Sequence, residues 1–489
     1  MKVVNRRVAT FSALALAFGI FIGGIVDGNN ILTICIPLAI AAAGMLFLFG
    51  KHPYAFVFYL CVALGISLFA IDANAVKIAD AGEYEVTARV VRAGENYYIA
   101  DDVSFDGAFY RGKIKINTSE DFSAGEEILF FTEIDVLNFD PFDSYSCWLY
   151  CDGVYYEADA TAVSVVGSKR KFFEKIMDRM SAPMYRFMQK EDVGIAKSLL
   201  FGDKSDLTAD DNATIRGIGL SHVFALSGLH VGFLMGIILF LAKKTKLNKK
   251  ITIALSVAVL FVYGITTGFP SGLKRAGIMT LCCLIAPLLK AKRDPLNTLG
   301  TACLIILATN PRELFDLSFI MSASAVFGIV AFYKPIASFI GGKRCGAIRK
   351  RFAEGTALTL SANVFLFPVC CNVFNSIAVY SVIANLVLLP LVGAAFSCLA
   401  VAAFLSLIFS GFGVLYYPLQ FLVIGIRVLS EFIYSLPYAT VSVPALGVSS
   451  ALYVLSAVVV SRFVKLGVRT KVALVSTLTV LWALCFVFL

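Results

Sequence analysis

Residues 220–241 read LSHVFALSGLHVGFLMGIILFL, and this stretch decides the class of the fold. It is long enough and apolar enough to cross the hydrocarbon core of a bilayer as one helix. Polar groups at that depth are costly and usually have a function. The first half nevertheless carries Ser221, His222, Ser227, Gly228 and His230. We therefore expect a membrane helix whose outer half contacts water and whose inner end is fixed by the following lysine-rich segment, KKTKLNKK.

The composition extends this expectation to the whole chain. Of its 489 residues, 59% are hydrophobic and only 15% are charged, and the mean hydropathy is +0.82. Soluble domains carry about 25% charged residues. The sequence therefore predicts a polytopic α-helical protein of the cell membrane, with about 13 crossings.

Four segments are expected along the chain. Hydrophobic stretches at 8–26, 31–49 and 54–71 form an N-terminal three-helix region, residues 1–72. An inserted domain at 82–167 and an amphipathic helix at 169–190 follow, and residues 193–489 form the main membrane domain. Besides the opening stretch and residues 377–411, that domain is expected to cross the membrane at 251–268, 276–289, 296–309, 315–333, 356–375, 414–434, 445–461 and 472–489.

Basic residues, which favour the cytoplasmic side of a membrane, set the orientation. Lys2, Arg6 and Arg7 place the N-terminus in the cytoplasm, so three crossings leave the insert outside. The basic clusters within 243–250, 290–293, 343–351 and 462–471 all lie inside if residues 377–411 make one net crossing. Because Pro390 interrupts that stretch, we expect a partial or re-entrant helix at 377–391 and a full span to about 410.

The insert has the pattern of an all-β domain. Alternating runs such as EYEVTARVV and RGKIKIN, separated by turn residues, predict five short strands and an OB-like barrel. It holds 17 acidic and 5 basic residues, a net charge of −12, which opposes phosphate binding unless the basic ones cluster: Arg89, Arg92, Arg111, Lys113 and Lys115. A structural or partner-docking role is therefore favoured. Cys147 and Cys151 are candidates for a tight disulfide if the insert is extracytoplasmic.

Residues 169–190 have the pattern of an amphipathic helix with a basic face. One apolar stripe has helical spacing: Phe173, Ile176, Met180, Met184 and Phe187. We expect this helix to lie on the membrane surface or on the membrane domain, in preference to guiding a polyanion.

The Ser/His group of the opening stretch supports three interpretations. Ser227 and His230 share a helix face at a spacing of three, and His222 and His230 are spaced so that both can face one cavity. The group is a set of buried neutral histidines, the lining of a polar pore, or the nucleophile and base of an intramembrane hydrolase. The last needs a third group that holds the base, and none is evident.

Other charged residues near the membrane have simpler alternatives. Lys274 and Arg275 lie at the outer mouth of a helix, where they either reach the lipid headgroups or offer positive charge to phosphates. Arg427 and Glu431, four apart in a membrane segment, are expected to pair. No nucleotide-binding or zinc-protease motif occurs, and the 12 cysteines have no metal-binding pattern, so no cofactor is expected.

Several motifs together resemble the ComEC family of DNA-uptake channel proteins. Leu199–Asp203 is similar to the family's LLxGD stretch, and Gly219–Val231 is similar to its GLSHLLAISGLHV block. GLKRAGIM, NPRELFDLSFIMSASAVFGIV and SIAVYSVIANLVLLPLVG resemble three later segments, the last of which supplies Asn385 and Pro390. The resemblance covers most of the chain.

The resemblance implies passage of single-stranded DNA across the cytoplasmic membrane during natural transformation. The path residues would be Asp203, Ser221, His222, Ser227, Gly228, His230, Lys274, Arg275, Asn385 and Pro390. The metallo-β-lactamase-like C-terminal domain of many family members is expected to be absent, so the resemblance implies that the chain is not an enzyme and has no nuclease activity of its own. The expected partners are then membrane lipids, a surface DNA receptor, a separate nuclease and motor, and further copies of the chain. The alternative function is transport or flipping of a small or lipid anion, with the β domain as an outer cap.

Overall fold

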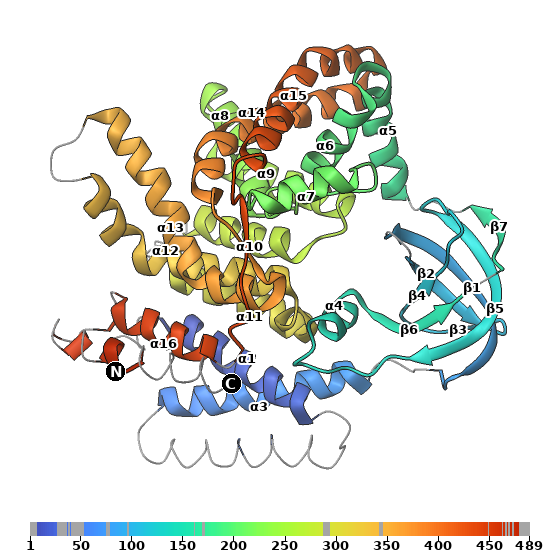
Figure 1. Ribbon diagram of the computed structural model, residues 1–489, viewed down its shortest axis with the longest axis horizontal. Coiled ribbons are helices and arrows are strands. Elements are labelled where there is room, and N and C mark those ends of the chain that lie inside the picture. The colour runs from blue at the N-terminus through green and yellow to red at the C-terminus, as the bar shows by residue number, and fades with distance from the viewer. Residues whose placement is uncertain are drawn as a thin grey trace. The chain divides into compact units, whose positions relative to one another are not determined.

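The structure is a computed structural model of the chain. It describes residues 7–26, 37, 40, 53–74, 79–94, 97–160, 162–168, 172–286, 294–341, 346–447, 449–461, 463–464, 467, 470–471 and 474–478. These residues form two compact units (Figure 1). The first comprises Met1–Asp178 and Ile278–Ile320, and the second comprises Arg179–Gly277 and Met321–Leu489.

Two long helices at the start of the first unit pack through glycines. In α1 (Val8–Val26) and α3 (Pro53–Asn74), Gly19 and Gly65 face the partner backbone. A Cβ at Gly19 would lie 2.1 Å from the Val62 carbonyl oxygen, and one at Gly65 would lie 2.3 Å from the Leu16 carbonyl oxygen. Small residues of this kind let membrane helices approach closely. The predicted helix at 31–49 lies almost wholly outside the described residues.

A third helix joins this pair from much later in the sequence. In α11 (Pro295–Thr309), Gly300 lies against the backbone of Thr10. The helix is capped by Asp294, whose carboxylate also accepts a hydrogen bond from Arg7 Nε at 2.9 Å. This helix was expected in the main membrane domain, but it packs in the first unit.

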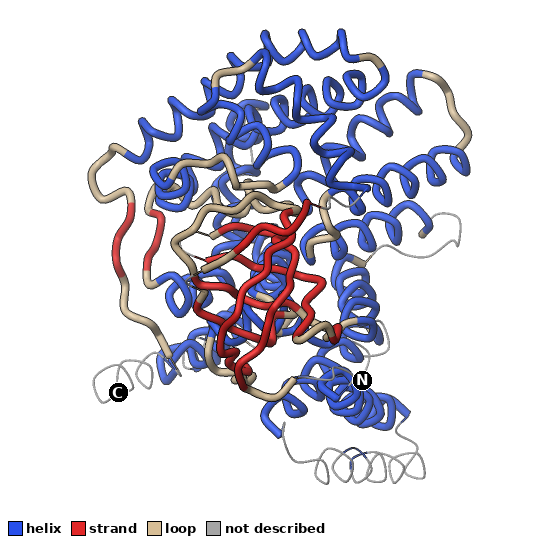
Figure 2. The backbone as a smooth tube through the Cα atoms, turned by 90° about the vertical axis from the view of Figure 1, so that its right-hand side faces the viewer, coloured by secondary structure: helices blue, strands red, loops and turns tan. Residues whose placement is uncertain are grey.

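The insert is a closed β-barrel, as predicted from its alternation. Its strands are β1 (Gly82–Ala93), β2 (Tyr97–Phe105), β3 (Ala108–Phe109), β4 (Lys113–Asn117), β5 (Glu126–Val136), β6 (Val154–Asp159) and β7 (Ser164–Ser168). Five of them close a ring in the order β1-β2-β4-β6-β5, because β5 also pairs with β1. Figure 2 shows the strands of the barrel in red. All ring pairings are antiparallel except that of β4 with β6.

A short helix in the barrel was not predicted. Asp143 caps the start of α4 (Ser144–Asp152) by accepting hydrogen bonds from two backbone amides, and Gly153 ends it with φ 79°. Cys147 and Cys151 lie one turn apart in α4 as free thiols, not as the suggested disulfide. Their sulfur atoms contact the backbone carbonyls of Asp140 and Arg312 respectively.

The second unit is a helical bundle. It contains α6 (Lys190–Phe201), α7 (Ala209–Gly217), α8 (Gly228–Lys244), α9 (Lys249–Thr266), α13 (Ala347–Phe374), α14 (Ser381–Ile408), the 3-10 helix η3 (Ser410–Leu415), α15 (Tyr416–Tyr434) and α16 (Ser449–Val460). Three helices run through a unit boundary: α5 (Phe172–Phe187), α10 (Ser271–Ile285) and α12 (Leu317–Gly341). Two short strands, β8 (Ser376–Ala378) and β9 (Thr440–Ser442), pair beside the bundle (Figure 2).

Among the described residues, seven helices are long and apolar enough to cross a membrane. They are Val8–Val26, Ala55–Asn74, Lys249–Thr266, Leu317–Gly341, Arg349–Phe374, Ser381–Ile408 and Ser410–Tyr434. The 13 expected crossings also include stretches that lie wholly or partly outside those residues, such as 31–49. Helices α11 and α16 are apolar but shorter. A membrane protein is indicated.

The predicted re-entrant helix at 377–391 is wrong. The first residues of that segment form β8, and α14 then runs without interruption for 28 residues with Pro390 inside it. Proline removes one backbone hydrogen bond, but neighbouring helices allow apolar membrane helices to continue through it. Residues 381–408 therefore form one long candidate span.

Candidate functional site

The segment Gly219–His230 does not form a helix throughout, contrary to the expectation from its apolar run. Residues 221–225 form turns and bends, and α8 begins at Gly228. Ser227 is the N-cap, where its Oγ accepts a hydrogen bond from Leu229 N at 3.3 Å. Ser227 N in turn donates to His230 Nδ1 at 3.1 Å, which completes a capping box. The two residues thus interact because they start the helix.

This geometry assigns the protons of His230. A backbone N–H can only donate, so Nδ1 is the acceptor and the neutral ring carries its hydrogen on Nε2. The ring is completely buried and stands edge-on to Phe396, with centroids 4.9 Å apart. Ser227 Oγ lies 3.5 Å from Nδ1, which the Ser227 amide already occupies. The arrangement is that of a helix start rather than that of a nucleophile and its base.

His222 lies in the turns and therefore does not share a helix face with His230. It is exposed, and its Nδ1 lies 3.1 Å from the Gly219 carbonyl oxygen. Ser221, beside it, is half-buried. Of the two histidines, His222 is therefore exposed at the protein surface, whereas His230 is buried.

Three other elements border the Gly219–His230 segment. A Cβ at Gly202, which ends α6, would lie 2.8 Å from Leu226 Cγ. A Cβ at Gly272 of α10 would lie 2.7 Å from the Leu226 carbonyl oxygen. A Cβ at Gly219 would lie 3.0 Å from the Cβ of Ser381, where α14 starts. The end of α6 and the starts of α10 and α14 thus meet this segment.

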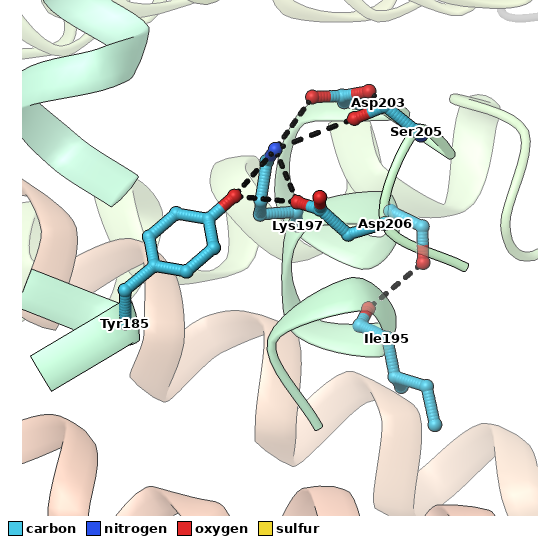
Figure 3. Close-up of polar contacts among 7 residues, drawn as sticks. Tyr185, Ile195, Lys197, Asp203, Ser205 and Asp206 are labelled. Carbon is cyan, nitrogen blue, oxygen red and sulfur yellow. Dashed lines mark hydrogen bonds and ion pairs between the residues drawn. The ribbon is translucent and has the colours of Figure 1, made fainter. Parts of the chain in front are cut away.

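A buried lysine lies just before this meeting point (Figure 3). Lys197 of α6 is 7% exposed. Its Nζ lies 3.0 Å from Asp203 Oδ2 and 2.6 Å from Asp206 Oδ2, and 3.0 Å from the hydroxyl of Tyr185. That hydroxyl donates to Asp206 Oδ2 at 2.5 Å. These four residues form the Lys197 cluster.

The cluster shifts the pKa values of its members in opposite directions. Burial alone would lower the pKa of Lys197, but the hydrogen bond to Asp206 and the charge of Asp203 outweigh it and raise this pKa. Burial alone would raise the pKa of Asp203, but the charge of Lys197 and the Ser205 amide lower it below its usual range. The lysine and Asp203 are therefore both charged at neutral pH.

A second buried charge on α6 pairs with α15. Asp192 is completely buried, and its Oδ2 accepts a hydrogen bond from Gln420 Nε2 at 3.1 Å. Its Oδ1 lies 3.4 Å from Arg427 Nη2. Arg427 was expected to pair with Glu431, but its ion pair among the described residues is with Asp192.

The remaining predicted path residues lie on α10 and α14. Arg275 is 1% exposed, and its Nε donates to Ser322 Oγ at 3.0 Å. Lys274, its neighbour, is half-buried. On α14, Asn385 is buried 11 residues before Phe396, which packs on His230, and Pro390 lies between them. The structure therefore links α14 to the Gly219–His230 segment at Gly219 and at His230.

Asp192 and Lys197 were missed by the sequence analysis. Both lie in α6, and every residue from Asp192 to Phe201 is buried. The available signal was a lysine inside an apolar run, followed at once by the acidic loop GDKSD. Within the described part of the chain, no three His, Cys, Asp or Glu residues gather as metal ligands.

A known protein family matches the part of the chain that contains these elements. The Competence protein family matches residues 199–467, which is more than half of the chain. The match includes the end of α6, the Gly219–His230 segment, the first turns of α10 and all of α14. The chain belongs to this family, the ComEC family of the resemblance.

Two curated relatives agree with the assignment. The chain is 21% identical over 249 residues to ComE operon protein 3 of Bacillus subtilis (strain 168), covering 50% of this chain and 31% of the relative. It is 22% identical over 270 residues to Recombination protein 2 of Haemophilus influenzae, covering 52% of this chain and 33% of the relative. The match thus spans about a third of each relative's length. No solved structure matches the chain.

Proposed function

We propose that this chain forms part of the path by which single-stranded DNA crosses the cytoplasmic membrane during natural transformation. Membership of the Competence protein family carries the proposal. The match covers the Gly219–His230 segment and the helices around it, so the proposed path follows this region.

Buried polar groups in the second unit support this placement. Asp192, Lys197, Arg275 and Asn385 are all buried in a unit built mostly of apolar helices. Ionisable groups at membrane depth commonly mark the route of a substrate or ion. A polyanion also needs accessible cations and stacking surfaces. Arg216 of α7 offers both, because it is exposed and its guanidinium lies 5.1 Å from the Phe374 ring.

The proposal assigns a structural role to some residues of this region and contact with the strand to others. His230, Ser227 and Arg275 hold α8, α10 and α12 in place, since their partners belong to the protein. His222 is exposed at the protein surface and Lys274 is half-buried, and both would contact the strand. Asp203 would act indirectly, by fixing Lys197.

The proposal also covers the orientation of the chain in the membrane, the type of barrel and the partner proteins. The N-terminus is cytoplasmic and the barrel extracytoplasmic, as the basic loops indicate. The barrel is OB-like, which the five-strand ring and its parallel β4–β6 pair support. The chain moves DNA without catalysis, and a surface receptor, a nuclease and a motor act with it.

The test is import of labelled double-stranded DNA in cells with the gene deleted and then restored. Label protected from external nuclease is counted separately from surface-bound label. We expect deletion to remove the protected label and to leave surface binding. Restoration with Arg216→Gln combined with Lys274→Gln should recover less than a tenth of the import, at wild-type protein levels in the membrane.

The matched control is Lys250→Gln, because Lys250 is an exposed lysine at the start of α9. Cells with this variant should import DNA normally. Unchanged import after deletion would refute the proposal and favour the transporter of a small or lipid anion. Normal import by the Arg216/Lys274 double variant would refute the placement of the path.

A further inference from the structure

One face of the barrel gathers aromatic rings and charged groups from five separate elements, α4, β1, β2, β4 and β6. Tyr145, Trp148 and Asp152 lie at helical spacing along α4, and Tyr97 starts β2. The Trp148 ring centroid lies 6.1 Å from that of Tyr97 and 6.0 Å from that of Tyr145. Tyr145 is 46% exposed, and Tyr97 and Trp148 are half-buried. We call this the aromatic face.

Cations lie over these rings. Lys115 Nζ of β4 is 5.6 Å from the Tyr97 ring and 5.4 Å from the Tyr145 ring. The guanidinium of Arg92, at the end of β1, is 5.8 Å from the Trp148 ring. Three of the five basic residues of the insert therefore meet here, since Lys113 lies two positions before Lys115 on the same strand.

Each of these cations is already paired with a carboxylate. Arg92 and Lys113 bind the two oxygens of Asp152 at 2.5 and 3.1 Å. Lys115 pairs with Glu157. Asn117 Nδ2 donates to Glu157 at 3.0 Å and to Asp159 at 2.9 Å. The three cations thus pair with two carboxylates, Asp152 and Glu157, and Asp159 is held beside them by Asn117. These three positive and three negative charges balance, and the insert as a whole carries −12.

This charge balance decides between classes of ligand. Phosphate binding depends on cations that release counterions into solution, and here the counterions are fixed carboxylates of the protein. A neutral sugar needs the opposite arrangement: an aromatic platform for its ring, and donors and acceptors side by side for its hydroxyl groups. OB-like barrels bind oligonucleotides or oligosaccharides on the second and third strands of the ring and in the adjoining loops. Tyr97, Lys113 and Lys115 lie on those strands.

We propose that the aromatic face binds an oligosaccharide of neutral pyranose units. Tyr145 and Trp148 stack on the sugar rings. Asp152, Glu157 and Asn117 bind the hydroxyl groups together with the cations they hold. This function is independent of the proposed DNA path, because every residue in it belongs to the barrel.

The test uses the full chain in lipid nanodiscs free of sugar headgroups and detergent. The protein has two tryptophans, Trp148 and Trp482, so fluorescence reports on the face directly. Chitohexaose, cellohexaose and a twelve-residue oligothymidylate are titrated separately. We expect at least one of the two saccharides to change the emission saturably and the oligothymidylate to have no effect at the same concentrations. Trp148→Phe should abolish the signal and leave Trp482 as the background.

Variants identify the site. Tyr145→Ala, which removes an exposed ring and keeps the reporter, should weaken saccharide binding at least tenfold. Phe131→Ala is the matched control, because Phe131 is an exposed aromatic residue, 68% accessible, on β5, which supplies no residue of the face. This variant should bind the saccharide as the wild type does. Asp152→Asn should weaken saccharide binding and strengthen oligothymidylate binding, since it releases two cations.

Three results would overturn the proposal. One is tighter binding of the oligothymidylate than of either saccharide by the wild type. Another is the absence of any saturable change with both saccharides at millimolar concentration. The third is unchanged saccharide affinity in Tyr145→Ala. None of these results affects the DNA import test, which depends on the second unit.

Discussion

Replacement of Lys197 by methionine tests the Lys197 cluster most directly. The substitution keeps the length and apolar stem of the side chain and removes the charge. Asp203 and Asp206 then lose the cation that lies 3.0 and 2.6 Å away. Removing one partner of a buried ion pair costs about 3–5 kcal/mol. The two carboxylates keep 24% and 32% of their exposure, so water screens part of the loss and we expect about 3 kcal/mol.

Thermal unfolding of the purified full chain measures this loss. At roughly 2–4 °C per kcal/mol for a unit of this size, the apparent Tm should fall by about 6–12 °C. Lys190→Met is the matched control, because Lys190 is exposed at the start of the same helix; it should stay within about 0.5 kcal/mol of the wild type. Adding Asp203→Asn and Asp206→Asn to Lys197→Met should recover much of the loss, since no uncompensated charge remains.

The pH dependence supplies a second check. The pKa of Asp203 is lowered on folding, so its contribution is present above the unfolded value of about 3.9 and is lost as the pH falls through the folded value. The pKa of Lys197 is raised, so its contribution is present below about 10.4 and is lost as the pH rises through the folded value. The penalty of Lys197→Met should therefore be full near neutrality and shrink in strong acid. A Tm within 2 °C of the wild type at pH 7 would refute this reasoning.

Three further predictions follow from single contacts. Ser227→Ala should destabilise the protein by about 1 kcal/mol through loss of the α8 cap, whereas Ser227→Asp should retain most of it; equal Tm values for both would contradict the capping geometry. Gly19→Val should separate α1 from α3, because its Cβ would meet the Val62 carbonyl oxygen at 2.1 Å. Gly232→Val should be tolerated, because nothing lies within 4 Å of a Cβ there. Similar expression of the two variants would contradict the close packing of α1 on α3. Burial, with the charges of Asp143 and Asp140, raises the pKa of Cys147 to about 11. Labelling of Cys147 by a maleimide should therefore be slow at pH 7 and accelerate towards pH 10. A disulfide of Cys147 in the non-reduced protein would contradict this prediction.

Patterns that depend on neighbours in the sequence were predictable. Alternation along the insert predicted the barrel. The apolar runs predicted the ends of α1, α3 and α9 to within a few residues, and the start of α13 to within about ten. The start of α8 was misplaced because the apolar run continues through turns up to Ser227. A capping box ordinarily has Glu or Gln at the third helical position, so the histidine there concealed the signal.

Contacts between distant residues had no local signal. Asp192 and Arg427 are 235 positions apart, and a four-residue spacing made Glu431 appear the natural partner of Arg427. The charges of the Arg92, Lys113 and Lys115 group were visible, but their pairing with Asp152 and Glu157 depends on the ring closure of the barrel. The sequence therefore predicted the members of these sites better than their partners.

Helix α6 connects two motifs of the family resemblance, Leu199–Asp203 and Gly219–Val231. Its 12 residues are too few to cross a bilayer, and from Asp192 onward they are buried within protein. A helix so placed must have its charges satisfied by neighbouring elements, and Asp192 pairs with α15 while Lys197 pairs with the loop after Gly202. Gly202 in turn contacts Leu226. The Leu199–Asp203 motif thus fixes the turns that precede α8, so a change in the Lys197 cluster should reach the Gly219–His230 segment through a direct contact.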